Sequence, residues 1–394
     1  MHSRAATAVA IAAAWAVAQT QPATRAGFVT TLGRDTVALE SFTRTPLRLE
    51  GDMVIRVPGT VRFHYLLDLR NDGTVSRSVV DMAPLGVPGY AARRVTLDFL
   101  RDSLRVTVDS LGRRSRMTRP LEAGAVPYFM TGFESSFGLY SSLGIAEYLI
   151  STIPVSATDT VTVASIGIDD GTPTKRKLMR RSATSADLDY FLIAWTRLVT
   201  DPQGHILSAD MSETTEKTQS ARTGYLDMGR AAKTFAERDR AGKGIGVASP
   251  NLKVTGTIGG SPVFIGYGSP RRRGREILGR VVPWDRVWRT GANEATVFIA
   301  DRDVTIGGAR VPAGSYSLWT LPTRAGVQLI INRQSGQWGT SYDPAKDLAR
   351  VPMQVSTASA PLEDFTISLA GSNSSTELRM AWDTFVWSVR IAAK

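Results

Sequence analysis

Few residues in this sequence have side chains suited to nucleophilic or metal chemistry, and their positions limit the reactions available. The 394-residue chain has no cysteine and three histidines, His2, His64 and His205. The part after residue 251 therefore lacks both thiol and imidazole groups, which excludes Ser–His and Cys–His pairs and histidine-ligated zinc there. We interpret His64 as a mid-strand residue and His205 as the start of a strand after a turn. The sequence predicts no catalytic triad, no metal site and no cofactor.

Carboxylates are the remaining candidates for acid–base chemistry, and Glu294 is the one that we consider. It lies near Arg289 and Asn293 in a segment with the character of a turn. A general acid or base of a hydrolase needs a second carboxylate at a suitable distance, and the sequence indicates none. The favoured interpretation is architectural: Arg289 and Glu294 form an ion pair that fixes the turn, and Asn293 adopts a left-handed backbone conformation. Glu294 is thus only a weak catalytic candidate.

Tryptophan gives a second signal, because six of the eight tryptophans lie after residue 251. A tryptophan on a β-sandwich can stack on a sugar ring while Arg, Asn and Glu side chains bind the hydroxyls, or it can fill the space between two sheets. We favour core packing for the group as a whole. The candidate binding residues, which lie around two turns, are Trp284, Trp288, Arg289, Asn293, Glu294 and Trp338.

These candidates are positioned by a strand-rich segment at residues 279–339. Short β-type runs at residues 295–300, 315–321 and 327–332 alternate with turns that contain glycine. Two-residue periodicity with glycine at the reversals is typical of antiparallel strands. About nine or ten strands after residue 251 predict an antiparallel β-sandwich or jelly roll.

Several motifs in this region occur together. They are Tyr267-Gly268-Ser269-Pro270, Val282-Pro283-Trp284, Val287-Trp288-Arg289-Thr290-Gly291-Ala292-Asn293-Glu294-Ala295-Thr296, Pro312-Ala313-Gly314-Ser315-Tyr316-Ser317-Leu318 and Gln337-Trp338-Gly339. Together they resemble the bacterial family known as domain of unknown function 2911, over about residues 252–391. Leu278 and Arg280 depart from the family's usual Phe and Gly. The family has no established activity, so the resemblance implies a domain but no reaction.

The preceding part of the chain, residues 28–212, also has a two-residue periodicity, as in the segment VRFHYLLDL at residues 61–69. One amphipathic helix is predicted at residues 136–151. The pattern predicts a curved antiparallel sheet or half-barrel with one helix, loosely similar to exported lipid-carrying half-barrels. Such a sheet could carry a hydrophobic ligand. Since both parts of the chain have strand patterns, the whole protein is predicted to be mainly β.

The N-terminus predicts export. Arg4 precedes an apolar run that ends in Ala16-Val17-Ala18, a small-residue cleavage site. No integral membrane segment is expected after cleavage, because no later run of about 20 apolar residues occurs. The location is therefore periplasmic or extracellular. The predicted divisions are a signal peptide at residues 1–18, a β domain at 28–226, a charged and glycine-rich linker at 227–251 and the second β domain at 252–394.

The net charge of +11 favours anionic partners in general. The only dense basic run, Arg271-Arg272-Arg273 with Arg275, lacks interleaved aromatics, so no nucleic-acid partner is predicted. The sequence does not indicate an oligomeric state. We expect a non-catalytic binding or structural protein of the cell envelope, with a carbohydrate or lipid ligand. The alternative is a carboxylate-dependent hydrolase that acts on an envelope polymer through Glu294.

Overall fold

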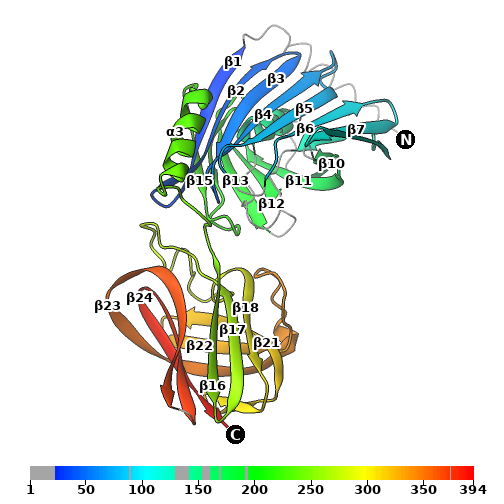
Figure 1. Cartoon of the computed structure of the whole chain (residues 1–394). Coiled ribbons are helices and arrows are strands. Elements are labelled where there is room, and N and C mark those ends of the chain that lie inside the picture. Colours follow the sequence, from blue (N-terminus) through cyan, green and yellow to red (C-terminus); the bar gives the residue numbers. More distant parts are fainter. Residues whose placement is uncertain are drawn as a thin grey trace. The chain divides into compact units, whose positions relative to one another are not determined.

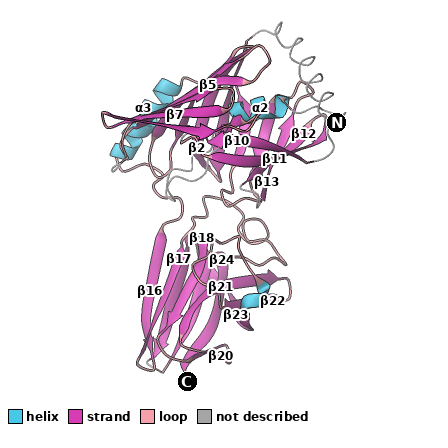
Figure 2. Ribbon diagram, turned by 90° about the vertical axis from the view of Figure 1, so that its right-hand side faces the viewer, coloured by secondary structure: helices cyan, strands magenta, loops and turns pink. Residues whose placement is uncertain are grey.

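The computed structural model describes residues 23–87, 90–128, 142–152, 160–167, 170–190, 194–372 and 374–394. The predicted signal peptide and the first part of the predicted helix at residues 136–151 lie outside the described residues. The chain divides into two compact units, unit 1 (Met1–Val247) and unit 2 (Ala248–Lys394). Each unit is built around one large open sheet (Figures 1 and 2), so the prediction of a mainly β protein is confirmed. No helix in the described ranges combines the length and apolar character needed to cross a membrane.

Unit 1 forms a 15-stranded sheet with the order β8-β7-β6-β5-β4-β3-β2-β1-β15-β14-β13-β12-β11-β10-β9. All neighbouring strands are antiparallel except β9 and β10. The first and last strands pair in the middle of the sheet, while the two edge strands, β8 and β9, are consecutive in the chain. The strands are β1 (Thr24–Leu32), β2 (Asp35–Thr45), β3 (Arg48–Ile55), β4 (Val61–Leu69), β5 (Val75–Pro84), β6 (Arg93–Phe99), β7 (Ser103–Ser110), β8 (Arg113–Pro120), β9 (Val126–Tyr128), β10 (Val161–Gly167), β11 (Pro173–Ser182), β12 (Ser185–Tyr190), β13 (Ala194–Thr200), β14 (Ile206–Asp210) and β15 (Gln219–Thr223).

Alternation of apolar and polar residues decides which face of this sheet is buried. In β4, residues 61, 63, 65, 67 and 69 are buried, and the residues between them are partly exposed. The period of two in the sequence is therefore also the period of burial, because successive side chains of a strand point to opposite faces.

A short helix, α2 (Leu143–Ser151), lies against the buried face. Its residues from Leu143 to Ile150 are all buried, and it contacts β2, β3 and β9. A Cβ on Gly144 would lie 2.6 Å from Tyr65 Oη and 3.0 Å from the Phe42 ring, so the close approach of helix and sheet requires glycine there. The helix thus covers the part of the buried face that β2 and β3 form.

The N-terminus of α2 is held by the buried carboxylate of Glu40 on β2. Glu40 accepts hydrogen bonds from Tyr65 Oη (2.6 Å), Ser142 Oγ (2.5 Å), Leu143 N (2.8 Å) and Gly144 N (3.2 Å). Burial raises the pKa of Glu40, and the hydrogen bonds only partly offset that rise. This carboxyl group is therefore a central link between the helix and the sheet.

The opposite face of the same strands is covered by α3 (Met228–Arg240). Its apolar stripe, which includes Met228 and Ala232, packs on Val54 and Leu39. Leu39 and Glu40 are adjacent on β2, so the two helices lie on opposite faces of the sheet (Figure 2).

Unit 2 forms a nine-stranded antiparallel sheet with the order β16-β17-β18-β21-β22-β23-β24-β19-β20. β16 also contacts β23 and β24, so the sheet folds over itself and encloses a core. The strands are β16 (Asn251–Ile258), β17 (Ser261–Gly268), β18 (Ala292–Ala300), β19 (Val304–Ile306), β20 (Ala309–Val311), β21 (Gly314–Thr323), β22 (Gly326–Asn332), β23 (Asp347–Ser372) and β24 (Ser375–Ala393), with one 3₁₀ helix, η1 (Pro344–Lys346).

Aromatic rings fill the core of unit 2. Trp288 packs against Phe365 (5.2 Å between ring centroids), Trp382 (6.2 Å) and Trp387 (6.3 Å). Trp319 is also fully buried, against Ala295 and Ile330 on another part of the sheet. Four of the six tryptophans of unit 2 are therefore core residues, as the sequence favoured.

Candidate functional site

The turn at residues 289–294 includes the first residues of β18 and has an unusual backbone. Thr290 (φ 56°), Gly291 (φ 156°) and Asn293 (φ 63°) all have positive φ. The predicted left-handed conformation of Asn293 is confirmed. Thr290 is fully buried. Because a β-branched side chain disfavours a positive φ, its backbone conformation is strained. Hydrogen bonds oppose that strain, because Thr296 Oγ1 donates to Thr290 O at 2.6 Å.

The segment at residues 337–339 pairs with this turn. Gly339 N donates to Asn293 O (2.9 Å), Ala295 N donates to Gln337 O (3.1 Å), and Glu294 and Trp338 form an isolated antiparallel bridge. Residues opposite each other in such a bridge are cross-strand neighbours. The exposed Glu294 and the partly buried Trp338, which are 44 positions apart in the chain, are therefore brought together.

Arg289 lies beside this bridge and packs on the segment at residues 337–339. A Cβ on Gly339 would lie only 1.9 Å from Arg289 Cδ, so the arginine side chain packs directly on the glycine. The ion pair between Arg289 and Glu294 stays a prediction. Four of the predicted site residues thus gather at the turn, namely Arg289, Asn293, Glu294 and Trp338.

The other two predicted residues lie elsewhere. Trp288 is 7% exposed and belongs to the core, because its backbone pairs with Thr320 of β21 and turns the indole inward. Trp284 is partly buried, and the Arg324 guanidinium lies 4.4 Å from its ring centroid. Trp288 is therefore corrected to a packing residue, and Trp284 forms a separate cation–π pair.

Beneath the turn is a buried polar group that sequence reasoning missed. Gln337 Nε2 and Trp319 Nε1 both donate to Ser317 Oγ at 2.8 Å. Gln337 Oε1 is buried without a hydrogen-bond partner in the described structure. Only the pairing of distant segments places these residues together, so no local sequence pattern marks them.

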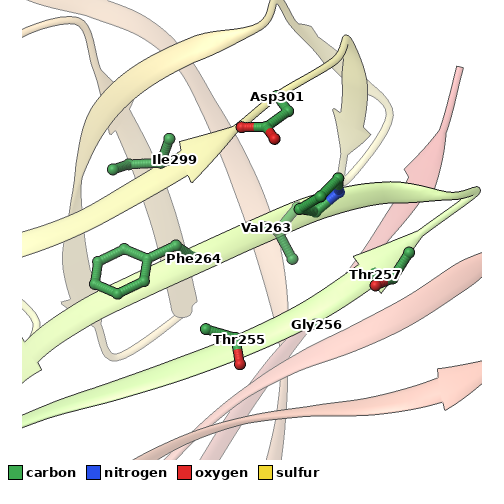
Figure 3. A pocket seen from close by; sticks show the side chains of 8 residues that line it. Thr255, Gly256, Thr257, Val263, Phe264, Ile299 and Asp301 are labelled. Atoms are coloured by element: carbon green, nitrogen blue, oxygen red, sulfur yellow. The ribbon is translucent and has the colours of Figure 1, made fainter.

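A second feature missed from sequence is an open hollow of about 510 Å³ on β16, β17 and β18. Figure 3 shows Phe264 and Ile299 at one end and Thr257 and Asp301 at the other. The residues that line it are Thr255, Gly256, Thr257, Pro262, Val263, Phe264, Ile299 and Asp301.

Strand register explains how the hollow forms. Thr255, Phe264 and Ile299 are opposite one another on the three strands, and the neighbours of Phe264, Val263 and Ile265, belong to the core. Phe264 therefore points away from the core. A Cβ on Gly266 would lie 3.1 Å from Phe264 Cε1 and 3.3 Å from Cζ, so the ring covers the glycine. The result is an aromatic surface on the sheet, flanked by hydroxyl groups and one carboxylate.

The remaining candidates from the sequence have structural partners. Arg271 pairs with Asp364 (3.1 Å) and Arg272 with Asp383 (3.0 Å), so acidic residues neutralise the basic run. His205 Nδ1 lies 2.7 Å from the Asp201 carboxylate at a hairpin turn. In the described ranges, no cluster of three or more His, Cys, Asp or Glu residues is arranged to hold a metal ion.

The comparison with protein families concerns unit 2. Residues 249–391 match the family model described as Protein of unknown function (DUF2911). The C-terminal part of the chain matches DUF2911. The resemblance seen in its motifs is therefore confirmed, and the turn, Trp338 and the hollow all lie inside the DUF2911 match. The N-terminal region has no family match.

No curated protein matches the chain. Among solved structures, the chain is similar to the crystal structure of a DUF1089 family protein from Pseudomonas aeruginosa. The sequence identity is 11% and the TM-score is 0.32, and the similarity covers 44% of this chain and 89% of that chain.

Proposed function

We propose that this protein is an exported, non-catalytic binding protein whose unit 2 binds a carbohydrate of the cell envelope. The observation that carries the proposal is the hollow on β16–β18, in which the Phe264 ring lies over Gly266. An aromatic ring held against the sheet offers an apolar surface on which one face of a sugar ring can stack. Export is inferred from Arg4 and the apolar run before the Ala16-Val17-Ala18 site.

The rest of the lining favours a sugar over a lipid chain. Thr255 and Thr257 contribute hydroxyl groups that both donate and accept hydrogen bonds, and Asp301 contributes an acceptor. A volume of about 510 Å³ lies in the usual range for small-molecule sites, which combine apolar lining with a few placed polar groups. An alkyl chain would leave these polar groups unpaired.

The same lining favours binding over hydrolysis. Glycosidases use two carboxyl groups on either side of the bond that they cleave. Asp301 is the one carboxylate among the described residues that line the hollow, and Glu294 is not part of this lining. Hydrolysis centred on Glu294 therefore stays the alternative. A lipid in unit 1 has weaker support, because α2 covers the buried face at β2 and β3.

The proposal is tested by screening the full chain against envelope polysaccharides and their fragments, followed by calorimetric titration of each hit. Phe264→Ala should weaken binding roughly tenfold, because it removes the stacking surface. Thr255→Val keeps the shape but removes one hydroxyl, and should weaken binding by a smaller factor. Trp338→Ala is the matched aromatic control at the turn and should leave the affinity unchanged.

Three outcomes would overturn this assignment. If no glycan binds, the proposed ligand class is wrong. If Trp338→Ala abolishes binding while Phe264→Ala does not, the site is at the turn. If new reducing ends accumulate with the wild-type protein but not with Glu294→Gln, the protein is a hydrolase.

A further inference from the structure

The hairpin of β7 and β8 forms one edge of the sheet of unit 1 (Figure 1 labels β7). β8 reads RRSRMTRP, and all its residues are exposed except Arg119, which is partly buried. β7 is the one strand in the described part of the chain that pairs with β8, and the exposed residues of β8 point to both of its faces. This strand therefore contributes little to the core of unit 1.

The charge of β8 is strongly positive. It contains four arginines and no acidic residue. Arg114 pairs with Asp109 on β7 at 2.6 Å, whereas Arg113 and Arg116 have no ion pair among the described residues. Charged residues on an edge strand can serve simply to prevent aggregation. The turn of the hairpin gives a second, independent observation.

Leu111 and Gly112 form that turn, with φ values of 52° and 72°. Two-residue hairpins with two positive φ values favour Asn-Gly, because asparagine tolerates this conformation and a bulky side chain does not. Leu111 is nevertheless present, and it is 81% exposed. Both its backbone conformation and its exposure are unfavourable in the isolated protein. Residues kept in such conformations are often functional.

We infer that the β7–β8 hairpin docks on the surface of an anionic lipid bilayer. Leu111 enters the apolar boundary of the headgroup region, while Arg113 and Arg116 bind lipid phosphates. The arginines match the anionic headgroups, and the apolar tip matches the acyl chains beneath them. Each basic residue near such a surface strengthens binding about fivefold, and a buried leucine strengthens it roughly tenfold. A nucleic-acid groove would instead need aromatics for base stacking, and residues 111–120 contain none. This inference is independent of the carbohydrate site.

The experiment measures co-sedimentation of the full chain with vesicles of phosphatidylcholine alone and with added phosphatidylglycerol. The wild type should sediment with the anionic vesicles but not with the neutral ones. Its binding to the anionic vesicles should weaken as the salt concentration rises. Leu111→Asn creates the favoured Asn-Gly turn, so the variant should fold at least as stably but bind roughly tenfold more weakly. The double variant Arg113→Glu with Arg116→Glu should lose at least about 25-fold.

Leu47→Asn is the matched control, since Leu47 is 49% exposed in another hairpin of the same sheet and beside another arginine, Arg48. It should bind like the wild type. The apolar N-terminal segment is the same in all variants, so differences in vesicle binding between them come from the hairpin. Absence of binding to anionic vesicles, or equal binding by Leu111→Asn and the wild type, would overturn the inference. The inference would also be overturned if the protein bound a short duplex DNA but no vesicles.

Discussion

Glu40 provides the sharpest test of how unit 1 is held together. Its side chain is 3% exposed, and its carboxylate accepts four hydrogen bonds at the start of α2. In Glu40→Ala, the hydroxyls of Tyr65 and Ser142 can reorient, but the backbone N–H groups of Leu143 and Gly144 stay buried without an acceptor. Each such group costs about 1–3 kcal/mol, so we expect a loss of about 4 kcal/mol in the free energy of unfolding.

Differential scanning calorimetry can detect this loss, with the transition of unit 2 as an internal reference. Glu50→Ala is the matched control on the next strand, because the nearest partners of Glu50 are 3.7 Å and 4.0 Å away and its side chain is 45% exposed. This control should change the stability by less than about 0.5 kcal/mol. A loss below about 1 kcal/mol for Glu40→Ala would show that the carboxylate does not hold α2.

The pH dependence of the same variant series follows from the direction of the pKa. Burial raises the pKa of Glu40 above 4.5, so between the unfolded and folded pKa values the folded state binds more protons than the unfolded state. Its contribution to stability is therefore complete below pH 4.5 and is lost as the pH rises through the folded pKa. Glu40→Gln does not titrate, so its stability relative to the wild type should increase as the pH rises above 4.5. A relative stability that falls over this range would contradict the direction of the shift.

Three further predictions concern other parts of the chain. Trp288→Ala should lower the free energy of unfolding by about 3–5 kcal/mol in urea titrations, because it empties the aromatic core, and a small effect would move Trp288 out of the core. Asn293→Gly should be nearly neutral while Asn293→Ala costs about 1–2 kcal/mol in the same assay, and equal costs would argue against the left-handed backbone. The hydrogen bond that His64 donates to the Asp52 carboxylate raises the pKa of His64 above 6.5, so NMR titration should show a lower pKa in Asp52→Asn, and an unchanged value would disprove the contact.

Strand positions were predictable from sequence because burial follows a period of two in segments such as β4. Strand order was not, because the pairing of β1 with β15 joins residues about 190 positions apart, as in Thr30 with Ser220. Strand length also could not be predicted from the sequence at the end of the chain, where β23 runs continuously from Asp347 to Ser372.

For the candidate site, the sequence predicted what depends on local backbone conformation and missed what depends on register. Asn293 was correctly placed in the left-handed region, since that tendency belongs to the residue type. Trp288 and Trp338 could not be separated into core and surface, because the distinction comes from the strands beside each of them. The hollow requires Gly266 to lie beneath Phe264 while Ile299 lies opposite, and only the alignment of three strands creates it.

The pairing of β1 with β15 also has a consequence for folding. These strands meet in the middle of the open sheet, while β8 and β9 are consecutive in the chain but lie at its two edges. The order of the strands in the sheet is therefore the order in the chain, circularly shifted so that it begins at β9 and ends at β8. A circular permutant of unit 1 that joins the segment after α3 to β1 and opens the chain between β8 and β9 would place the two strands of every antiparallel pair next to each other in the chain order. Because local pairing closes shorter loops, this permutant should fold faster than the natural chain and keep the same sheet.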